Sequence, residues 1–236
     1  MKSNFDFLDN EFPVLAQFGK KAELYLYSDS NSCLMKLGMI GETVVNLMFT
    51  YDRITLPAEN TAVNRIVVLF REGLLTQDLV DILHALRKVR NKAVHENYAS
   101  VADGKVLLQM AHSLCEWFMQ TYGDWNYKNK PFILPADLPV EASTDTGAEQ
   151  EHEKQLSKEA EEKAAASDSV AKEKRRQQAA KAASQRQKTE AETRYMIDQQ
   201  LRQVGWEADT ENLRFSKGTR PVKGRNLAIA EWPTDS

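Results

Sequence analysis

The hydrophobic positions of the chain follow a helical period over its first half. From Thr76 to His95, apolar side chains recur at steps of three and four residues, which places them on one face of a helix. Similar patterns, several of them preceded by a residue that can cap a helix, predict further helices. They lie at 4–19, with Gly19 as an end or as a joint in a helix that reaches Tyr27, and at 33–51, 63–72 and 100–122. Residues 4–122 are therefore predicted to form an all-α bundle of about five helices around one core.

After the bundle the hydrophobic pattern changes. Residues 123–139 are aromatic and interrupted by proline, which predicts an extended tail packed against the bundle. Residues 140–189 are rich in Ala, Glu, Lys and Gln and carry almost no large apolar side chain. They predict a solvated, charged linker that is helical or disordered.

An apolar helical face returns in the last part of the chain, at 190–206. Two strand-like runs follow, at 213–215 and 227–230, and they predict the beginning of an α/β domain. The fold class is accordingly mainly α, and the predicted domains are 1–139, 140–189 and 190–236.

Composition narrows the setting of the protein without naming its chemistry. The 236 residues carry 31 Lys and Arg against 34 Asp and Glu, a net charge of −3, so contact with nucleic acid needs a local basic patch. Cys33 and Cys115 lie in apolar helical patterns without the spacing of metal ligands, so no metal site is predicted. The first residues are too polar for a signal peptide, and no apolar run approaches the length of a membrane span. We expect a cytoplasmic protein that does not contact a membrane.

Candidate chemistry gathers at the end of the 76–95 helix. Arg90 falls on the edge of the apolar face, where a guanidinium is costly to bury without a partner, and Asn91 and His95 share a side of the helix. Gly38 weakens its own helix by roughly 1 kcal/mol relative to Ala, which indicates a close neighbour, and Glu42 follows one turn later as the candidate partner of Arg90. One interpretation is architectural, with a buried Arg90 tying helices together. The other is a phosphate and ribose site, in which Arg90 holds phosphate and His95 acts as acid or base.

A second candidate patch is a glycine-containing loop near the C-terminus. Its cations suit contact with a phosphate backbone, and they equally suit solubility alone. They are Lys217, Arg220, Lys223 and Arg225. The basic stretch 172–188 allows the same two interpretations.

Several strings resemble known families. Residues 90–95 (RNKAVH) resemble the mark of HEPN helical domains, an Arg followed by a polar residue and by a His four to six residues on. Residues 33–42 (CLMKLGMIGE) and 81–98 (DILHALRKVRNKAVHENY) are more specific, and they resemble the HEPN-like domain at the start of the motor (R) subunit of type I restriction enzymes. Residues 193–206 (TRYMIDQQLRQVGW) and 211–233 (ENLRFSKGTRPVKGRNLAIAEWP) resemble the start of the endonuclease domain of that subunit.

The resemblance implies the opening portion of a much longer subunit of a restriction–modification system, which defends against phage and other foreign DNA. This portion would be a non-catalytic assembly or DNA-handling module, with methyltransferase and specificity subunits as partners and DNA bound through the complex. The PD-D/ExK nuclease motif and the P-loop GxxxxGKT are not among these residues, so ATP and Mg²⁺ are expected for the longer subunit and no cofactor is expected here. The alternative that the resemblance implies is a metal-independent ribonuclease. It would use Arg90 and His95, with Asn91 fixing the geometry of the site, and form a homodimer through the helical domain.

Overall fold

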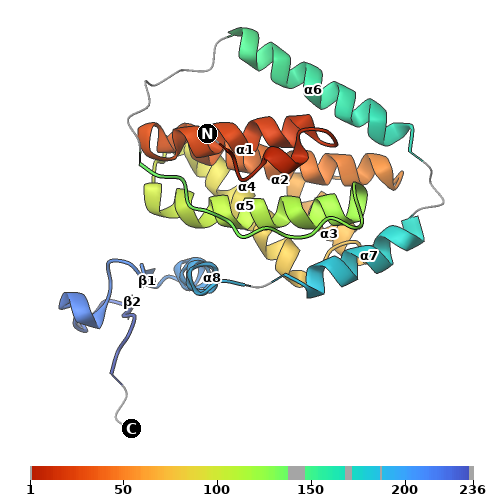
Figure 1. Ribbon diagram of the computed structural model, residues 1–236. Coiled ribbons are helices and arrows are strands. Elements are labelled where there is room, and N and C mark those ends of the chain that lie inside the picture. The colour runs from red at the N-terminus through yellow and green to blue at the C-terminus, as the bar shows by residue number, and fades with distance from the viewer. Residues whose placement is uncertain (1, 138–146, 168–171, 187, 234–236) are drawn as a thin grey trace. The chain divides into compact units, whose positions relative to one another are not determined.

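The computed structural model describes residues 2–137, 147–167, 172–186 and 188–233, and the chain divides into two compact units, 1–186 and 187–236. The first unit is helical (Figure 1). Its elements are the 3₁₀ helix η1 (Asp6–Leu8) and the α-helices α1 (Pro13–Ser28), α2 (Ser30–Tyr51), α3 (Ala62–Arg71), α4 (Gln77–Glu96), α5 (Val101–Tyr122), α6 (Gly147–Ala165) and α7 (Lys172–Ser184). The predicted mainly-α fold class is confirmed.

Local chemistry explains where these helices begin and how α1 continues. The side chains of Asp29, Thr61 and Ser100 each accept a hydrogen bond from the backbone N–H three residues further on, which caps α2, α3 and α5. Gly19 lies inside α1 and does not end it. A Cβ atom at Gly19 would fall 2.2 Å from the ring of Phe5, so the glycine makes room for that buried ring.

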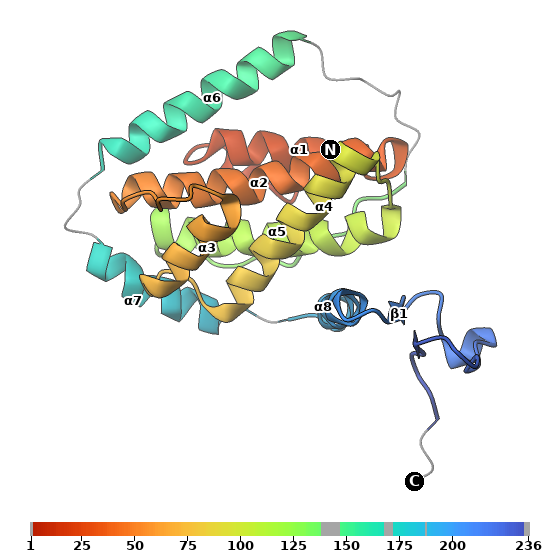
Figure 2. The ribbon, with the colours of Figure 1, turned by 180° about the vertical axis from the view of Figure 1, so that it is seen from behind.

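Helix α2 is the centre of the bundle, and it packs against α1, α4 and α5. Figure 2 shows α3 and α4 side by side and crossing α2. By length and composition α2 could cross a membrane, which contradicts the expectation that no apolar run reaches that length. The most apolar 18-residue window of α2 is 67% buried inside the fold, as in the core helix of a bundle.

The predicted solvated linker is the largest difference between the sequence analysis and the structure. Helices α6 and α7 belong to the first unit, where α6 packs on α1 and α2, and α7 packs on α5. Each buries two alanines and one charged side chain, because alanine allows close approach and the charges find partners. The buried residues are Glu153, Ala160 and Ala164 on α6, and Arg175, Ala179 and Ala182 on α7. The predicted boundary at residue 139 lies outside the described residues, and the first unit extends to Arg186.

The tail after α5 has no helix within 124–137, as predicted, and it is fixed by hydrogen bonds to the bundle. The backbone N–H of Lys130 donates to Glu116 on α5 at 2.6 Å, and the Tyr27 hydroxyl donates to the carbonyl of Pro135 at 2.9 Å. Tyr127 stacks on Phe7, so aromatic side chains of the tail do pack against the bundle.

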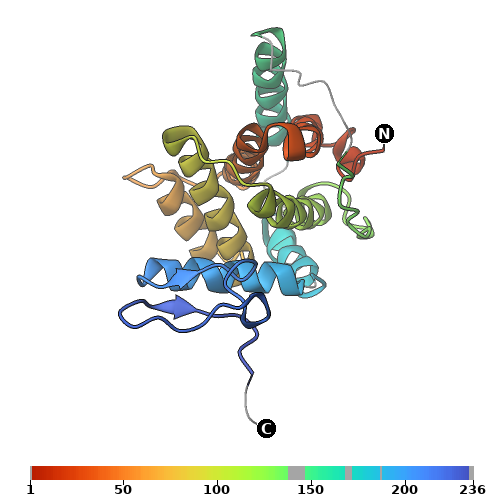
Figure 3. The same ribbon diagram turned by 90° about the vertical axis from the view of Figure 1, so that its left-hand side faces the viewer.

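The second unit consists of α8 (Glu190–Gln203), β1 (Glu207–Ala208), the 3₁₀ helix η3 (Phe215–Lys217) and β2 (Leu227–Ala228). The two strands pair in parallel, with Glu207 opposite Leu227 (Figure 3). The strand predicted at 213–215 is wrong, because only Arg214 forms a bridge, to Ala230, and η3 begins at the next residue.

Candidate functional site

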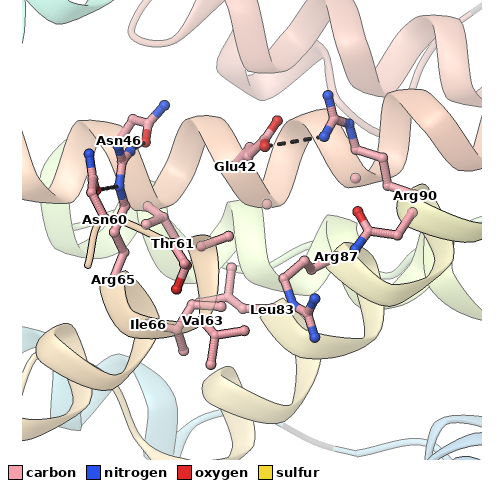
Figure 4. A pocket seen from close by; sticks show the side chains of 15 residues that line it. Glu42, Asn46, Asn60, Thr61, Val63, Arg65, Ile66, Leu83, Arg87 and Arg90 are labelled. Carbon is pink, nitrogen blue, oxygen red and sulfur yellow. Dashed lines mark hydrogen bonds and ion pairs between the residues drawn. The ribbon is translucent and has the colours of Figure 1, made fainter. Parts of the chain in front are cut away.

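The described part of the first unit has a groove of about 380 Å³ lined by α2, α3, α4 and the segment before α3 (Figure 4). Three guanidinium groups and one carboxylate line it, together with asparagine amides and a central apolar surface. The charged residues are Arg65, Arg87, Arg90 and Glu42. The groove therefore includes part of the motif at the end of α4.

Arg90 and Glu42 form an ion pair across α2 and α4, with Nη1 and Oε1 3.2 Å apart. The pair is half exposed, at 34% for the Arg90 side chain and 47% for the Glu42 side chain, so the expectation of a buried architectural arginine is wrong. The reason lies in the arginine's aliphatic stem. A Cβ atom at Gly38 would be 2.2 Å from the Cβ of Arg90, so the stem packs on the glycine while the guanidinium reaches the surface.

The other two residues of the motif are exposed. Asn91 lines the groove. His95, in the last turn of α4, is not one of the described residues that line it. The end of α4 is fixed from α2, because the side-chain amide of Asn31 donates to the carbonyls of Ala93 and Tyr98 at 2.9 and 2.8 Å. The structure thus joins Arg90 and Asn91 in one groove and places His95 outside it.

Two arginines of the groove were missed in the sequence analysis. Arg65 on α3 donates from Nε to the side-chain oxygen of Asn60 at 2.6 Å and from Nη1 to that of Asn46. Arg87 precedes Arg90 by three residues on α4, and its buried Nε has no hydrogen-bond partner among the described residues. The three-residue spacing of Arg87 and Arg90 is the signal that could have pointed to a shared face. Arg65 is brought in only by the packing of α3.

The charge of this region affects its neighbours. Burial lowers the pKa of Lys88, and the positive charge of Arg87 lowers it further. Burial also lowers the pKa of His84, with Arg87 and Lys88 adding to the effect and Asp81 opposing it. This part of α4 thus carries cationic side chains that lower the pKa of neighbouring basic groups.

Metal and thiol chemistry receive no support from the described residues. Within them, no group of three or more His, Cys, Asp or Glu side chains is arranged to hold a metal ion. Burial raises the pKa of the Cys33 thiol to about 12 and raises that of Cys115 further, so neither forms a reactive thiolate near neutral pH.

The predicted basic loop of the second unit is exposed, and two of its four cations already have partners. Arg225 forms a forked ion pair with Glu207, with Nε 2.8 Å from Oε1. The guanidinium carbon of Arg220 lies 3.9 Å from the centre of the Phe215 ring. Lys217 and Lys223 project as exposed cations without an ion pair among the described residues.

These observations define a helical domain with a cationic groove, followed by a small unit with parallel strands. The first belongs to a recognised family: the model of the domain of unknown function DUF4145 matches residues 20–165, so the chain is a member of that family. A second family model, described as the second domain of the type I restriction enzyme EcoKI endonuclease subunit, matches residues 207–236.

A curated relative supports the match to a type I restriction enzyme. Over an alignment of 285 residues, the chain is 31% identical to the type I restriction enzyme EcoKI endonuclease subunit of Escherichia coli (strain K12), and the match covers 99% of this chain and 24% of that protein. The chain thus spans about a quarter of the relative's length. The resemblance to the N-terminal part of a type I R subunit is confirmed. No solved structure matches the chain with statistical significance.

Proposed function

We propose that the chain is the N-terminal assembly and DNA-handling module of a type I restriction endonuclease subunit, and that its 236 residues are not catalytic. The similarity to the Escherichia coli subunit along 99% of the chain carries this proposal. Its partners are the methyltransferase and specificity subunits in the cytoplasm, and DNA reaches it through the complex. ATP and Mg²⁺ serve the longer subunit.

The exposed cations of the second unit support the DNA-handling part of this proposal. Lys217 and Lys223 are available for phosphate contacts, whereas Arg225 is engaged with Glu207. Because each phosphate contact releases counterions, binding through these lysines weakens as salt rises.

Two measurements test the proposal. In size-exclusion chromatography the chain should co-elute with a complex of methyltransferase and specificity subunits, and a plasmid incubated with the chain, ATP and Mg²⁺ should remain uncut. Plasmid cleavage would overturn the non-catalytic assignment, and separate elution would overturn the assembly role. In gel shifts, Lys217→Gln with Lys223→Gln should weaken DNA binding and reduce its dependence on salt, while Lys158→Gln, on the exposed face of α6, should leave both unchanged.

A second candidate function, the HEPN-type ribonuclease, is favoured by one observation. Asn91 and His95 are both exposed and lie one turn apart on α4, where RNA and a second copy of the chain can reach them. In this mechanism Arg90 holds the scissile phosphate, and His95 deprotonates the ribose 2′-hydroxyl.

RNA cleavage in the presence of EDTA tests the ribonuclease directly. The wild-type chain should cut RNA, His95→Ala should lose the activity, and His152→Ala, an exposed histidine on α6, should keep it. Sedimentation should show a dimer. Equal cleavage by the wild type and His95→Ala, or cleavage by neither, removes this candidate.

A further inference from the structure

The groove lined by α2, α3 and α4 holds more positive charge than its own residues neutralise. Among the described residues, Arg90 is the one arginine of the three that has a carboxylate partner, Glu42. Arg65 is held by the neutral amides of Asn46 and Asn60, which orient the guanidinium and leave its charge in place. Arg87 has a buried Nε without a partner among the described residues. A buried donor without a partner is costly, so the site is suited to an anion that supplies the missing acceptor.

The shape of the groove adds a second requirement. Figure 4 shows Arg65 on one side of the groove and Arg87 and Arg90 on the other, with Val63 and Leu83 between them. The side chain of Leu83 is buried, whereas Val63 is 38% exposed. A volume of about 380 Å³ falls in the range of small-molecule sites. The arrangement suits a ligand that has an apolar ring as well as negative charge.

The start of α3 also favours an anionic ligand. Thr61, Ala62 and Val63 line the groove, so the first turn of this ten-residue helix faces it. The N-terminal end of a helix carries partial positive charge and free N–H groups, which favour an anion.

We propose that this groove binds a phosphate-bearing ligand of nucleotide size, with the phosphate on the guanidinium groups and the ring against the apolar surface of Val63. Arginine recognises phosphate through paired N–H donors, and the asparagine amides of the groove can hydrogen-bond a sugar or base edge. The site does not need His95, and it goes beyond the proposed assembly function. The phosphate can belong to a free nucleotide or to the end of a nucleic-acid strand.

Calorimetric titration of the full chain separates these sources. The probes are adenosine 5′-monophosphate, adenosine, inorganic phosphate, and a short single-stranded DNA with or without a 5′-phosphate. Adenosine should bind about tenfold or more weakly than its monophosphate, because it lacks the charge-assisted hydrogen bonds. Tighter binding of the monophosphate assigns the groove to free nucleotides, and tighter binding of the 5′-phosphorylated strand assigns it to strand ends. Equal binding of adenosine and its monophosphate, or no binding of any phosphate probe, would overturn the proposal.

Paired substitutions at one position locate the site. Val63→Glu places a carboxylate in the groove at the first turn of α3, where an acidic residue suits the helix, so the fold should be retained while phosphate binding falls about tenfold or more. Val63→Gln has nearly the same size as Val63→Glu without the charge, so it loses only the apolar contact with the ring and should weaken phosphate binding much less than Val63→Glu does. Arg87→Gln should lose about tenfold in affinity, whereas Arg71→Gln, exposed on α3 outside the groove lining, should not. Unchanged affinity in Val63→Glu and Arg87→Gln, with melting curves like the wild type, would place the ligand elsewhere. Tighter binding of a poly-glutamate peptide than of any phosphate probe would also reject the assignment.

Discussion

Two ion pairs of the first unit differ sharply in their surroundings. Arg90 and Glu42 join α4 to α2 within the bundle, yet both side chains remain substantially exposed. Arg175 on α7 pairs with Asp52 just after α2, with Nε and Oδ1 2.7 Å apart, and these side chains are 7% and 0% exposed. The pair formed by the charged, alanine-rich segment is therefore buried, and the pair formed by two core helices is at the surface.

The difference shows how a sequence with few large apolar residues can pack. Arg175 also donates to the carbonyl of Tyr51 at 2.9 Å and lies over the rings of Tyr51 and Tyr122, so both its charge and its stem are accommodated. The Tyr122 hydroxyl donates to Asp52 at 2.7 Å. On α6, Glu153 accepts from Lys36 at 2.8 Å in equally buried surroundings. Ion pairs and hydrogen bonds of this kind allow charged side chains to occupy positions that apolar residues usually fill.

The largest effect is expected from breaking the buried pair. Asp52→Ala leaves the Arg175 guanidinium without its carboxylate and also removes the partner of the Tyr122 hydroxyl. We expect a loss of about 3–5 kcal/mol in the free energy of unfolding, measured by urea denaturation. Release of α7 would limit the loss, and faster proteolysis within 172–184 would reveal it.

The matched control is Glu72→Ala, which removes the partner of Lys172 and Arg176 on the same helix. The Glu72 side chain is 36% exposed, so its loss should cost about 1 kcal/mol or less. Equal effects of the two substitutions would contradict the comparison between buried and exposed pairs.

Glu116 on α5 extends the comparison to a buried carboxyl group that has no arginine or lysine as an ion-pair partner among the described residues. It accepts hydrogen bonds from the backbone N–H of Lys130 and from the Tyr127 hydroxyl. Burial raises its pKa from 4.5 to about 7, against the opposing effect of the Lys130 N–H. The folded state therefore keeps the proton more tightly than the unfolded state, and this contribution to stability is lost as the pH rises from about 4.5 through 7. Glutamine has no carboxyl proton to lose, so the free energy of unfolding of Glu116→Gln does not fall in this way. Relative to that of the wild type, it should rise by about 3 kcal/mol between pH 4.5 and pH 8.

The protonation of His112, which lies beside Glu116, changes stability with pH in the opposite direction. The two effects must therefore be measured separately. Burial lowers the pKa of His112 from 6.5 to about 4, so its contribution is complete above pH 6.5 and is lost as the pH falls towards 4. Urea denaturation of wild type and Glu116→Gln at both pH values isolates the carboxyl group. Glu151→Gln, at an exposed position of α6, should follow the wild type at each pH. Parallel curves for Glu116→Gln and the wild type would reject the pKa assignment.

The sequence predicted the helices of the bundle well, because apolar periodicity and caps such as Thr61 and Ser100 are local signals. It also indicated the proximity of Arg90 and Glu42, through the glycine one turn before the carboxylate. It could not predict the packing of α6 and α7, because a charge run gives no sign of a distant partner: Asp52 and Arg175 are 123 residues apart. For the same reason Arg65 was missed, since only the folded arrangement of α3 brings it to the groove.

Gly38 tests how closely the stem of Arg90 is held. Alanine normally stabilises a helix interior by about 1 kcal/mol relative to glycine. Here the added methyl group would meet the Arg90 Cβ at 2.2 Å, so we expect Gly38→Ala to lose about 1–3 kcal/mol in urea denaturation. The double variant with Arg90→Gly should recover much of the loss, because it removes the opposing Cβ. As a control, Gly147→Ala, at the start of α6 with open space around it, should not destabilise the fold.

The smallest effect is expected from the exposed pair itself. Arg90→Ala removes one half-exposed ion pair and the packing of the stem on Gly38, and we expect a loss of about 1 kcal/mol or less, reduced further by salt. Glu42→Gln should cost no more, because the remaining guanidinium can be hydrated. Urea denaturation at low and high salt measures both. A loss for Arg90→Ala as large as that for Asp52→Ala would mean that this guanidinium is held as tightly as that of Arg175, and the distinction between the two pairs would fail. A small loss would leave Arg90 free to be substituted without unfolding the bundle, so that its contribution to phosphate binding or RNA cleavage can be measured in a folded protein.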